Sequence, residues 1–409
     1  MQKLFIETPM FVVIFCMMFK RILSKPQRKH LGLFLTQRMV GSPKHQTISK
    51  LKKLFLNSPS TNASDNFLKT PTNAWSKIKE KRKDIISSKF ASKKGALIID
   101  DTLCYKTGKK MKDIFENFCH LLKKQVLSHV VVTSVYKTPK ISIGYDFKVY
   151  IPKEIAENFK SKYDLALEII KDAFRRGLIR RVYMDSWYCQ PELLRKLKPM
   201  KLEFFGMFRI GRLKIKSKGE WMTLSIFVDE IINKNLFSYR TLKGRKKSYK
   251  IRFYREIVLV KHLGKINLVI SQKYDQKKKI FNEPRVYVTN VFSLNALEVI
   301  RVYLNRWDIE VFHKSIKQSY GFEDYQVINA QARDAYFELA FLSDMLLHFK
   351  RLGQLVLQGA SAYVLRDVST EKVGSEDLVL SALAAQKKGT LNEFIELCGF
   401  DKKKFDFFT

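Results

Sequence analysis

Two spacings of apolar residues divide the chain into a β-containing middle and helical flanks. Ala96–Ile99 is wholly apolar, and Ile141–Ile151 alternates between apolar and polar residues. The first pattern predicts a buried strand and the second a half-buried one. Leu165–Arg176 repeats its apolar residues every three or four positions and stops at Gly177, as an amphipathic helix does. Strands followed by strand–helix alternation predict an α/β layer with a mixed sheet.

The region from about residue 211 to 288 has a different pattern. Its stretches are rich in β-branched and aromatic residues, with Gly- and Lys-bearing turns between them. This composition predicts a mainly antiparallel β insertion. Strands are expected at His129–Tyr136, Ile179–Met184 and Leu202–Phe208 in the core and at Trp221–Val228, Tyr249–Val260 and Ile266–Tyr274 in the insertion, with a core helix at Pro191–Leu197.

Both ends of the chain have helical patterns. Ala74–Ser88 predicts a charged helix, and Ser58–Asp65 predicts a turn or loop rich in N-cap residues. After Phe292 the chain turns helical again, through Ala330–Leu357. The predicted parts are a small helical DNA-binding domain (1–90), the first part of an α/β core (91–210), the β insertion (211–288), the second part of the core (289–357) and a helical tail (358–409).

Met10–Phe19 is an apolar run of ten residues near the start of the sequence. A membrane-spanning helix needs about 20 such residues. A signal peptide would have a basic start and a cleavage site of small residues, and neither is clear here. A buried helix is the preferred interpretation, and a membrane anchor is the alternative.

The charge of the chain is strongly positive. Its 76 Lys and Arg residues against 39 Asp and Glu residues give a formal net charge of +37. Residues 1–94 hold 20 basic and four acidic residues, and Tyr239–Lys265 holds ten basic and one acidic residue. Such an excess predicts a polyanionic partner, with nucleic acid favoured over an anionic membrane surface.

Several classes of site are disfavoured. The five cysteines are scattered without a Cys-x-x-Cys pair, and the seven histidines lack zinc-binding spacing. A disulfide scaffold and a zinc site are therefore not expected, and the cysteine usage suits a reducing cytoplasm. The sequence has no Walker-type loop or Gly-x-Gly-x-x-Gly, so NTP dependence is not expected.

One predicted helix combines charges in an informative order. Tyr303, Arg306, Glu310 and Lys317 fall within an arc of about 60° on an α-helix, opposite an apolar face. A carboxylate flanked by two cations and a phenol suits a metal ligand beside a phosphate. The alternative is a solvent-exposed pair between Arg306 and Glu310, which are four positions apart.

Two further acids follow predicted strands. Asp100 comes directly after Ala96–Ile99, and Asp185 comes directly after Ile179–Met184. Catalytic groups collect at the carboxyl ends of strands in α/β sheets, so both are expected to meet Glu310. Three carboxylates suit Mg²⁺ or Mn²⁺, and two such ions can promote phosphodiester transfer. Asp101 is the alternative to Asp100, because either residue can cap while the other ligates.

These motifs together resemble a known family. Asp100-Asp101-Thr102, then Asp185-x-Trp-Tyr188, then Tyr303-x2-Arg306-x3-Glu310-x6-Lys317 is similar to the DDE transposases of bacterial insertion sequences. The similarity covers about residues 95–350 and is greatest to the cut-and-paste group, which has a β-rich insertion in an RNase H-like core.

The resemblance implies an enzyme that cleaves transposon ends and joins the freed 3′-hydroxyl to target DNA. It implies that Asp100, Asp185 and Glu310 hold two Mg²⁺ or Mn²⁺ ions, and that Tyr303, Arg306 and Lys317 contact the DNA backbone. It also implies a homodimer on double-stranded DNA, in the bacterial cytoplasm with the nucleoid. Neither a membrane nor an NTP requirement is expected. The alternatives are a catalytically decayed or domesticated DNA-binding derivative and an RNase H-like nuclease without strand transfer.

The insertion adds further candidate DNA contacts. The basic residues Lys246 and Lys247 are expected to follow flanking DNA. Members of the family use an aromatic residue of the insertion to hold a flipped base, and Trp221 is the Trp of this insertion. Packing inside the sheet is the alternative for Trp221. Trp187 and Trp307 lie beside candidate catalytic residues and are expected to pack against the site.

Overall fold

A computed structural model describes residues 8, 10–40, 47–55, 58–70, 72–119, 122–243 and 248–351. The elements of its helical N-terminal part are α1 (Met10–Met17), α2 (Lys25–Val40), α3 (Ile48–Leu54), α4 (Thr61–Leu68) and α5 (Thr72–Phe90). The core contains β1 (Ala96–Tyr105), β2 (Phe115–Cys119), β3 (Lys124–Lys137), β4 (Ser142–Tyr150), α6 (Lys162–Arg175), β5 (Arg181–Met184), α7 (Pro191–Leu197), η1 (Lys198–Met200) and β6 (Glu203–Phe208). The next elements are β7 (Lys214–Ser217), β8 (Glu220–Thr223), α8 (Leu224–Asn233), β9 (Ser238–Lys243), β10 (Ser248–Val260), β11 (Gly264–Asp275), β12 (Ile280–Phe281) and β13 (Arg285–Thr289). The last described elements are α9 (Ala296–Tyr303), η2 (Leu304–Arg306), α10 (Trp307–Ser319) and α11 (Ala330–Arg351).

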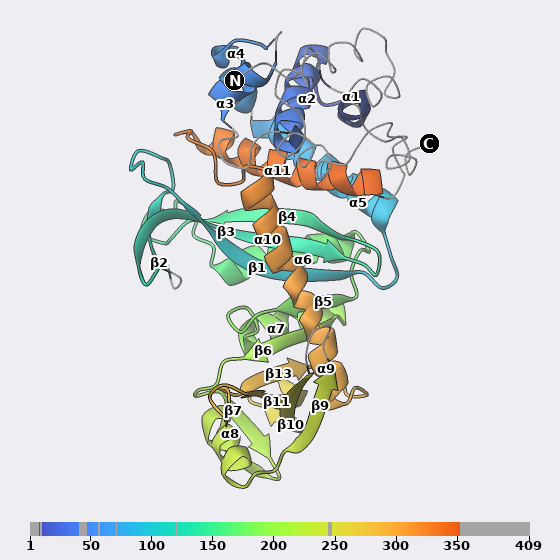
Figure 1. The fold of residues 1–409 in the computed structure, drawn as a ribbon, viewed down its shortest axis with the longest axis vertical. Helices are drawn as coiled ribbons and strands as arrows, with labels where there is room; N and C mark the ends of the chain where they lie inside the picture. Colours follow the sequence, from blue (N-terminus) through green and yellow to red (C-terminus); the bar gives the residue numbers. More distant parts are fainter. Residues whose placement is uncertain are drawn as a thin grey trace.

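The expected mixed sheet is present. β4, β3 and β1 form an antiparallel meander, and β5 and β6 then add in parallel to β1. The sheet continues without a break from β6 through β13 and β11 to β10, β7 and β8. The insertion is therefore an extension of the core sheet, since β13 pairs antiparallel with β6. In Figure 1 the core strands lie in the middle of an elongated molecule, with the insertion at the bottom.

Three predicted elements differ from the structure. The first strand does not end at Ile99, because β1 runs on to Tyr105 and pairs with β3 along its whole length. The expected loop Ser58–Asp65 instead contains the start of α4, whose first turn is capped by the Ser60 hydroxyl. The expected strand Trp221–Val228 changes to helix α8 after Thr223, which caps that helix.

The helical flanks pack together at one end of the molecule. The N-terminal helices lie over α11, and α5 lies beside it (Figure 1). The apolar run at the start forms α1, which buries Val12 and Phe15 while Val13, Ile14 and Met17 stay partly exposed. Among the described helices, none combines the length and apolar character needed to cross a membrane. The predicted tail 358–409 lies outside the described residues.

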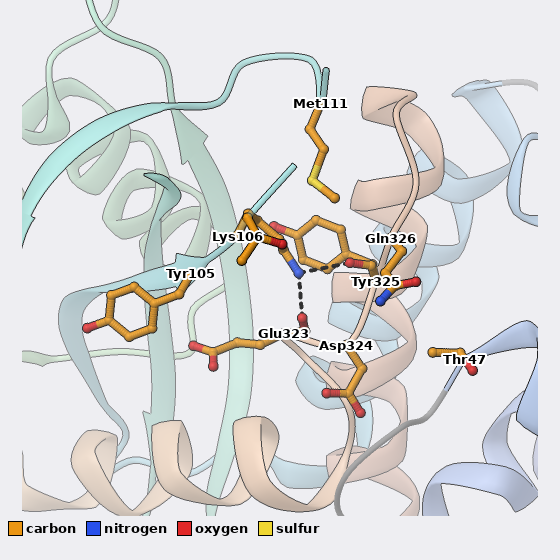
Figure 2. A pocket seen from close by; sticks show the side chains of 9 residues that line it. Thr47, Tyr105, Lys106, Met111, Glu323, Asp324, Tyr325 and Gln326 are labelled. Carbon is orange, nitrogen blue, oxygen red and sulfur yellow. Dashed lines mark hydrogen bonds between the residues drawn. The ribbon is translucent and has the colours of Figure 1, made fainter. Parts of the chain in front are cut away.

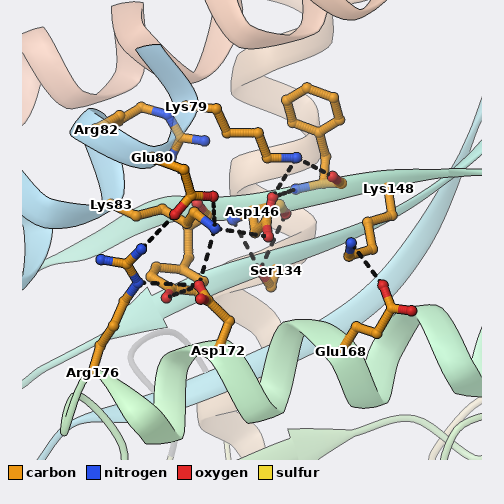
Figure 3. Close-up of polar contacts among 12 residues, drawn as sticks. Lys79, Glu80, Arg82, Lys83, Ser134, Asp146, Lys148, Glu168, Asp172 and Arg176 are labelled. Atoms are coloured by element: carbon orange, nitrogen blue, oxygen red, sulfur yellow. Dashed lines mark hydrogen bonds and ion pairs between the residues drawn. The ribbon is translucent and has the colours of Figure 1, made fainter. Parts of the chain in front are cut away.

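Buried hydrogen bonds and ion pairs hold α5 against the core (Figure 3). The fully buried Arg82 donates from Nε and Nη2 to both carboxylate oxygens of Glu338 on α11, at 2.5 and 3.0 Å. Its Nη1 donates to the carbonyls of Gly144 and Tyr145 on β4. Lys83 of the same helix lies 3.0 Å from Asp172 on α6. These contacts hold the last N-terminal helix on the edge strand of the meander.

Candidate active site

The two aspartates of β1 face opposite sides of the sheet, because side chains alternate along a strand. The Asp100 carboxylate lies 3.0 Å from the guanidinium of Arg306, which precedes α10. The Asp101 carboxylate lies 2.8 Å from the amine of Lys162, the first residue of α6. Both acids sit in the middle of β1, so neither follows the strand or caps a later element, as expected for a strand that ends at Ile99.

Asp185 begins a tight turn after β5, the strand parallel to β1. Its Oδ1 accepts hydrogen bonds from the backbone amides of Trp187 and Tyr188, both at 3.0 Å. Burial raises the pKa of Asp185, and so does the nearby Asp101 carboxylate, while these amides oppose the shift. The side chain therefore stays fixed at the carboxyl end of β5, next to β1.

The segment that carries the third acid is helical but not one uniform helix. Tyr303 ends α9, Arg306 ends the 3₁₀ turn η2, and Glu310 lies in the first turn of α10. The apolar side packs as expected, with Ile309 and Ile316 fully buried. The 3₁₀ turn separates Tyr303 from α10, and Tyr303 is buried against the ring of Tyr287.

Arg306 joins the acids of two distant segments. Its Nη1 lies 3.0 Å from Asp100 and its Nη2 lies 3.0 Å from Glu310. Burial raises the pKa of Asp100 to about 8, with a further upward contribution from Asp185 that the Arg306 charge partly offsets. A nearby positive charge favours the ionised form of a carboxyl group. A cation bound at this site would therefore lower the pKa of Asp100.

The oxygen-rich donor set fits a divalent cation. Ligand atoms of Asp100, Glu310 and His313 all lie within 4.8 Å of one another. Carboxylate oxygens are the preferred ligands of Mg²⁺ and Mn²⁺. Asp185 adds a further carboxylate whose charge acts on Asp100. Asp100, Glu310 and His313 could therefore hold a divalent cation, and Asp185 is not one of this close group.

His313 is a residue that the sequence interpretation missed. It lies three positions after Glu310, a spacing that places both on one side of a helix and that could have identified it. Its Nε2 is 2.6 Å from the hydroxyl of Thr133 on β3, and burial lowers the pKa of the imidazole to about 3. The Thr133 hydroxyl also lies 3.3 Å from the Asp100 carbonyl, so a neutral His313 ties α10 to the strand that carries Asp100.

Lys317 lies on the same side of α10 as Glu310, and its amine already has partners within the protein. Its amine donates to the carbonyl of Leu103 at 2.6 Å and forms an ion pair with Glu323. Figure 2 shows the segment that carries Glu323, where Lys106 donates to the carbonyls of Glu323 and Tyr325. A pocket of about 310 Å³ lies beside this segment. Lys106 thus fixes the backbone of the residue that holds Lys317.

The tryptophans are more exposed than residues of a packed core. Trp187 and Trp307 are 50% and 64% exposed, so much of each indole is left uncovered. Trp221 is also half-exposed, on the terminal strand β8, which rules out packing in the sheet core. It is separated from β1 by the intervening strands β5, β6, β13, β11, β10 and β7. Lys246 and Lys247 lie outside the described residues.

The family of the chain follows from a match over its central region. Residues 97–345 match the model of the family described as Transposase DDE domain, which is more than half of the chain. The protein belongs to the DDE transposases. Among curated proteins, none matches it. The predicted family is confirmed, while the narrower insertion-sequence group stays a prediction.

Membership explains the chemistry of the site. DDE transposases are phosphoryl-transfer enzymes that act on DNA with divalent metals. All three candidate acids of this transposase lie inside the matched range. The cluster around Arg306 is therefore located in the catalytic domain of the family.

Proposed function

We propose that this transposase cleaves DNA at the ends of its element and transfers the freed 3′-hydroxyl to target DNA, as in cut-and-paste transposition. The observation that carries the proposal is the meeting of Asp100 and Glu310 around one guanidinium, beside Asp185. The order β4-β3-β1-β5-β6, with its antiparallel meander and two parallel strands, supports an RNase H-like core.

Asp100, Asp185 and Glu310 would hold two Mg²⁺ or Mn²⁺ ions. When bound, such ions lower the pKa of a water molecule and stabilise the leaving oxygen. Asp100 is favoured over Asp101 because it shares Arg306 with Glu310, whereas Asp101 pairs with Lys162 on the α6 side.

The side chains around the acids would position the DNA. The buried hydroxyl of Tyr303 has no hydrogen-bond partner among the described residues, and it would have to move out of its buried position to donate to a phosphate oxygen. Arg306 would exchange one carboxylate for a phosphate once cations neutralise the acids. Lys317 would contact the backbone of the transposon end from the same side of α10.

The two chemical steps are the same exchange with different nucleophiles. In the first, a water oxygen attacks phosphorus, the P–O3′ bond breaks, and the departing oxygen gains a proton to become a 3′-hydroxyl. In the second, this 3′-hydroxyl loses its proton, attacks a phosphorus of the target strand and displaces a 3′ oxygen there. Both steps need the nucleophile and the leaving oxygen on opposite sides of the phosphorus.

The partners follow from the same proposal. The DNA is double-stranded, and two subunits would bring two ends together, in the bacterial cytoplasm with the nucleoid. Lys246 and Lys247 would follow flanking DNA. Trp221 would hold a base only where the insertion reaches DNA away from the acids of its own chain, given its position on β8.

The test compares Glu310→Gln with Glu283→Gln, which changes an exposed acid before β13. The substrate is a duplex from the DNA bordering the gene, in Mg²⁺. We expect Glu310→Gln to bind the duplex but to lose strand cleavage, and Glu283→Gln to match the wild type. Cleavage by Glu310→Gln at the wild-type rate would exclude the metal-ligand role. A wild-type protein that binds but does not cleave would identify a decayed enzyme.

A further inference from the structure

We infer that Trp187 is a stacking platform for a base of the DNA strand next to the scissile phosphate, an inference that rests on the proposed function. Trp187 is half-exposed, two residues after Asp185. An exposed aromatic ring beside a candidate catalytic acid is suited to stacking on a nucleotide base. The platform consists of the Trp187 indole, the Lys162 amine and the Tyr150 ring.

Hydrogen bonds and burial of its neighbours fix the turn that carries Trp187. The exposed position of the indole is therefore defined by the fold. The Trp187 amide is held by Asp185, and its carbonyl accepts a hydrogen bond from the Tyr163 hydroxyl at 3.2 Å. The next two residues, Tyr188 and Cys189, are completely buried. A rigid aromatic ring binds with little loss of conformational entropy.

A fixed positive charge lies next to the indole. The Lys162 amine is 5.5 Å from the ring centre of Trp187 and 5.6 Å from that of Tyr150. Its ion pair with Asp101 holds it in this position. A cation between aromatic rings is complementary to the backbone phosphate of a nucleotide whose base lies on one of the rings.

The distance between Asp185 and Trp187 determines which base of the DNA strand can reach the indole. Consecutive Cα atoms are about 3.8 Å apart, so Trp187 lies within roughly 8 Å of the Asp185 Cα. Phosphates along one DNA strand are spaced at about 3.4 Å of helix axis. A phosphate at the acids therefore leaves a base one or two nucleotides away within reach of the indole. Only a terminal or unpaired base can stack on the indole. The stacking does not depend on which of the four bases it is.

The experiment measures binding without divalent metal, using short duplexes from the DNA bordering the gene that end at the cleavage position. We expect Trp187→Ala to weaken binding about 5- to 150-fold and Trp187→Phe to stay within about threefold of the wild type. Phe174→Ala is the matched control, since it changes an exposed aromatic residue roughly 18 Å along α6 from Lys162. It should bind as the wild type does.

Abasic nucleotides placed one at a time near the cleavage position identify the base. The wild type should lose affinity at one position, and Trp187→Ala should lose nothing more there. Equal losses for both proteins at every position would overturn the platform, as would wild-type affinity in Trp187→Ala. A change of oligomeric state in Trp187→Ala without DNA would assign the indole to a subunit contact instead.

These outcomes are separate from the test of the proposed function. Binding is measured without metal, so loss of the metal-ligand role of Glu310 would leave the Trp187 result intact. Conversely, normal stacking by Glu310→Gln protein would support the platform even where cleavage is abolished.

Discussion

At the scale of single residues, the site depends on Arg306, which lies between Asp100 and Glu310 where a cation would also bind. Two acids so close would repel each other without a counter-charge. Arg306 supplies that charge in the metal-free protein. In the metal-free protein both carboxylates are therefore paired with Arg306.

The raised pKa of Asp100 predicts pH-dependent metal binding. A carboxyl with a pKa of about 8 must lose its proton before it ligates, so Mn²⁺ affinity should rise about tenfold per pH unit up to pH 8. The stability of the metal-free protein should change in the opposite direction. Because the pKa of Asp100 is higher in the folded than in the unfolded protein, the free energy of unfolding should fall as pH rises from about 4 to 8. Calorimetric titration with Mn²⁺ at pH 6, 7 and 8 measures the first effect. Equal affinity at pH 6 and 8 would contradict it, and Asp100→Asn should weaken binding and reduce its pH dependence.

Glu323 predicts a gain in DNA binding on substitution. Because its carboxylate pairs with Lys317, Glu323→Gln should free that amine for a phosphate. We expect about two- to tenfold tighter binding at low salt and a salt slope steeper by up to about one. Fluorescence anisotropy over a range of salt concentrations measures both. Glu116→Gln, an exposed acid on β2, is the control, and identical changes in the two variants would show a mere change of net charge.

At the scale of elements, the position of α10 depends on short polar contacts to strands far away in sequence. His313 contacts Thr133 of β3, and Asp308 pairs with Lys137 of the same strand. Gly144 of β4 lies so close to α10 that an added Cβ would be 2.6 Å from the Phe312 ring. A side chain at this position would push the helix, and with it Glu310, away from Asp100.

The buried pair of Arg82 and Glu338 predicts a large loss of stability when one partner is removed. Arg82→Met should lower the free energy of unfolding by about 3–5 kcal/mol, because Glu338 stays buried without a counter-charge. Urea denaturation followed by circular dichroism measures it.

The double variant Arg82→Met/Glu338→Leu should recover most of that loss, since both charges are then gone. Lys69→Met breaks the exposed pair with Asp65 and should cost at most about 0.5 kcal/mol. A loss from Arg82→Met no larger than that of Lys69→Met would show that the buried pair does not hold α5 to the core.

At the scale of the whole molecule, one sheet runs from the catalytic strands through the insertion. The helical ends cover one end of the molecule, and the insertion forms the other (Figure 1). With a net charge of +37, the chain is suited to contact DNA over a long path. Binding should accordingly fall steeply with salt.

Substitution of Lys246 and Lys247 tests whether the insertion contributes DNA contacts. Replacing both by Ala should reduce the slope of log K against log salt by about two while leaving metal affinity unchanged. Binding isotherms from 50 to about 200 mM salt provide the slope. An unchanged slope would exclude phosphate contacts by both lysines.

The sequence by itself determined the family and the α/β middle, and it predicted the three acids. Apolar periodicity locates most strands and helices to within a few residues, and the spacing of Tyr303, Arg306, Glu310 and Lys317 is a property of local sequence. Local pattern failed where one strand continued through charged residues. β1 passes Asp100 and Asp101 without a break because its pairing with β3 stabilises it there.

Tertiary structure decided which groups meet. The contact of Arg306 with Asp100 joins residues 206 positions apart, and sequence spacing carries no information about it. The outward position of Trp187, the ion pair of Asp101 with Lys162 and that of Lys317 with Glu323 also depend on neighbouring elements. Local periodicity shows which side of an element is apolar, but only the packed sheet and helices determine what each polar side chain contacts.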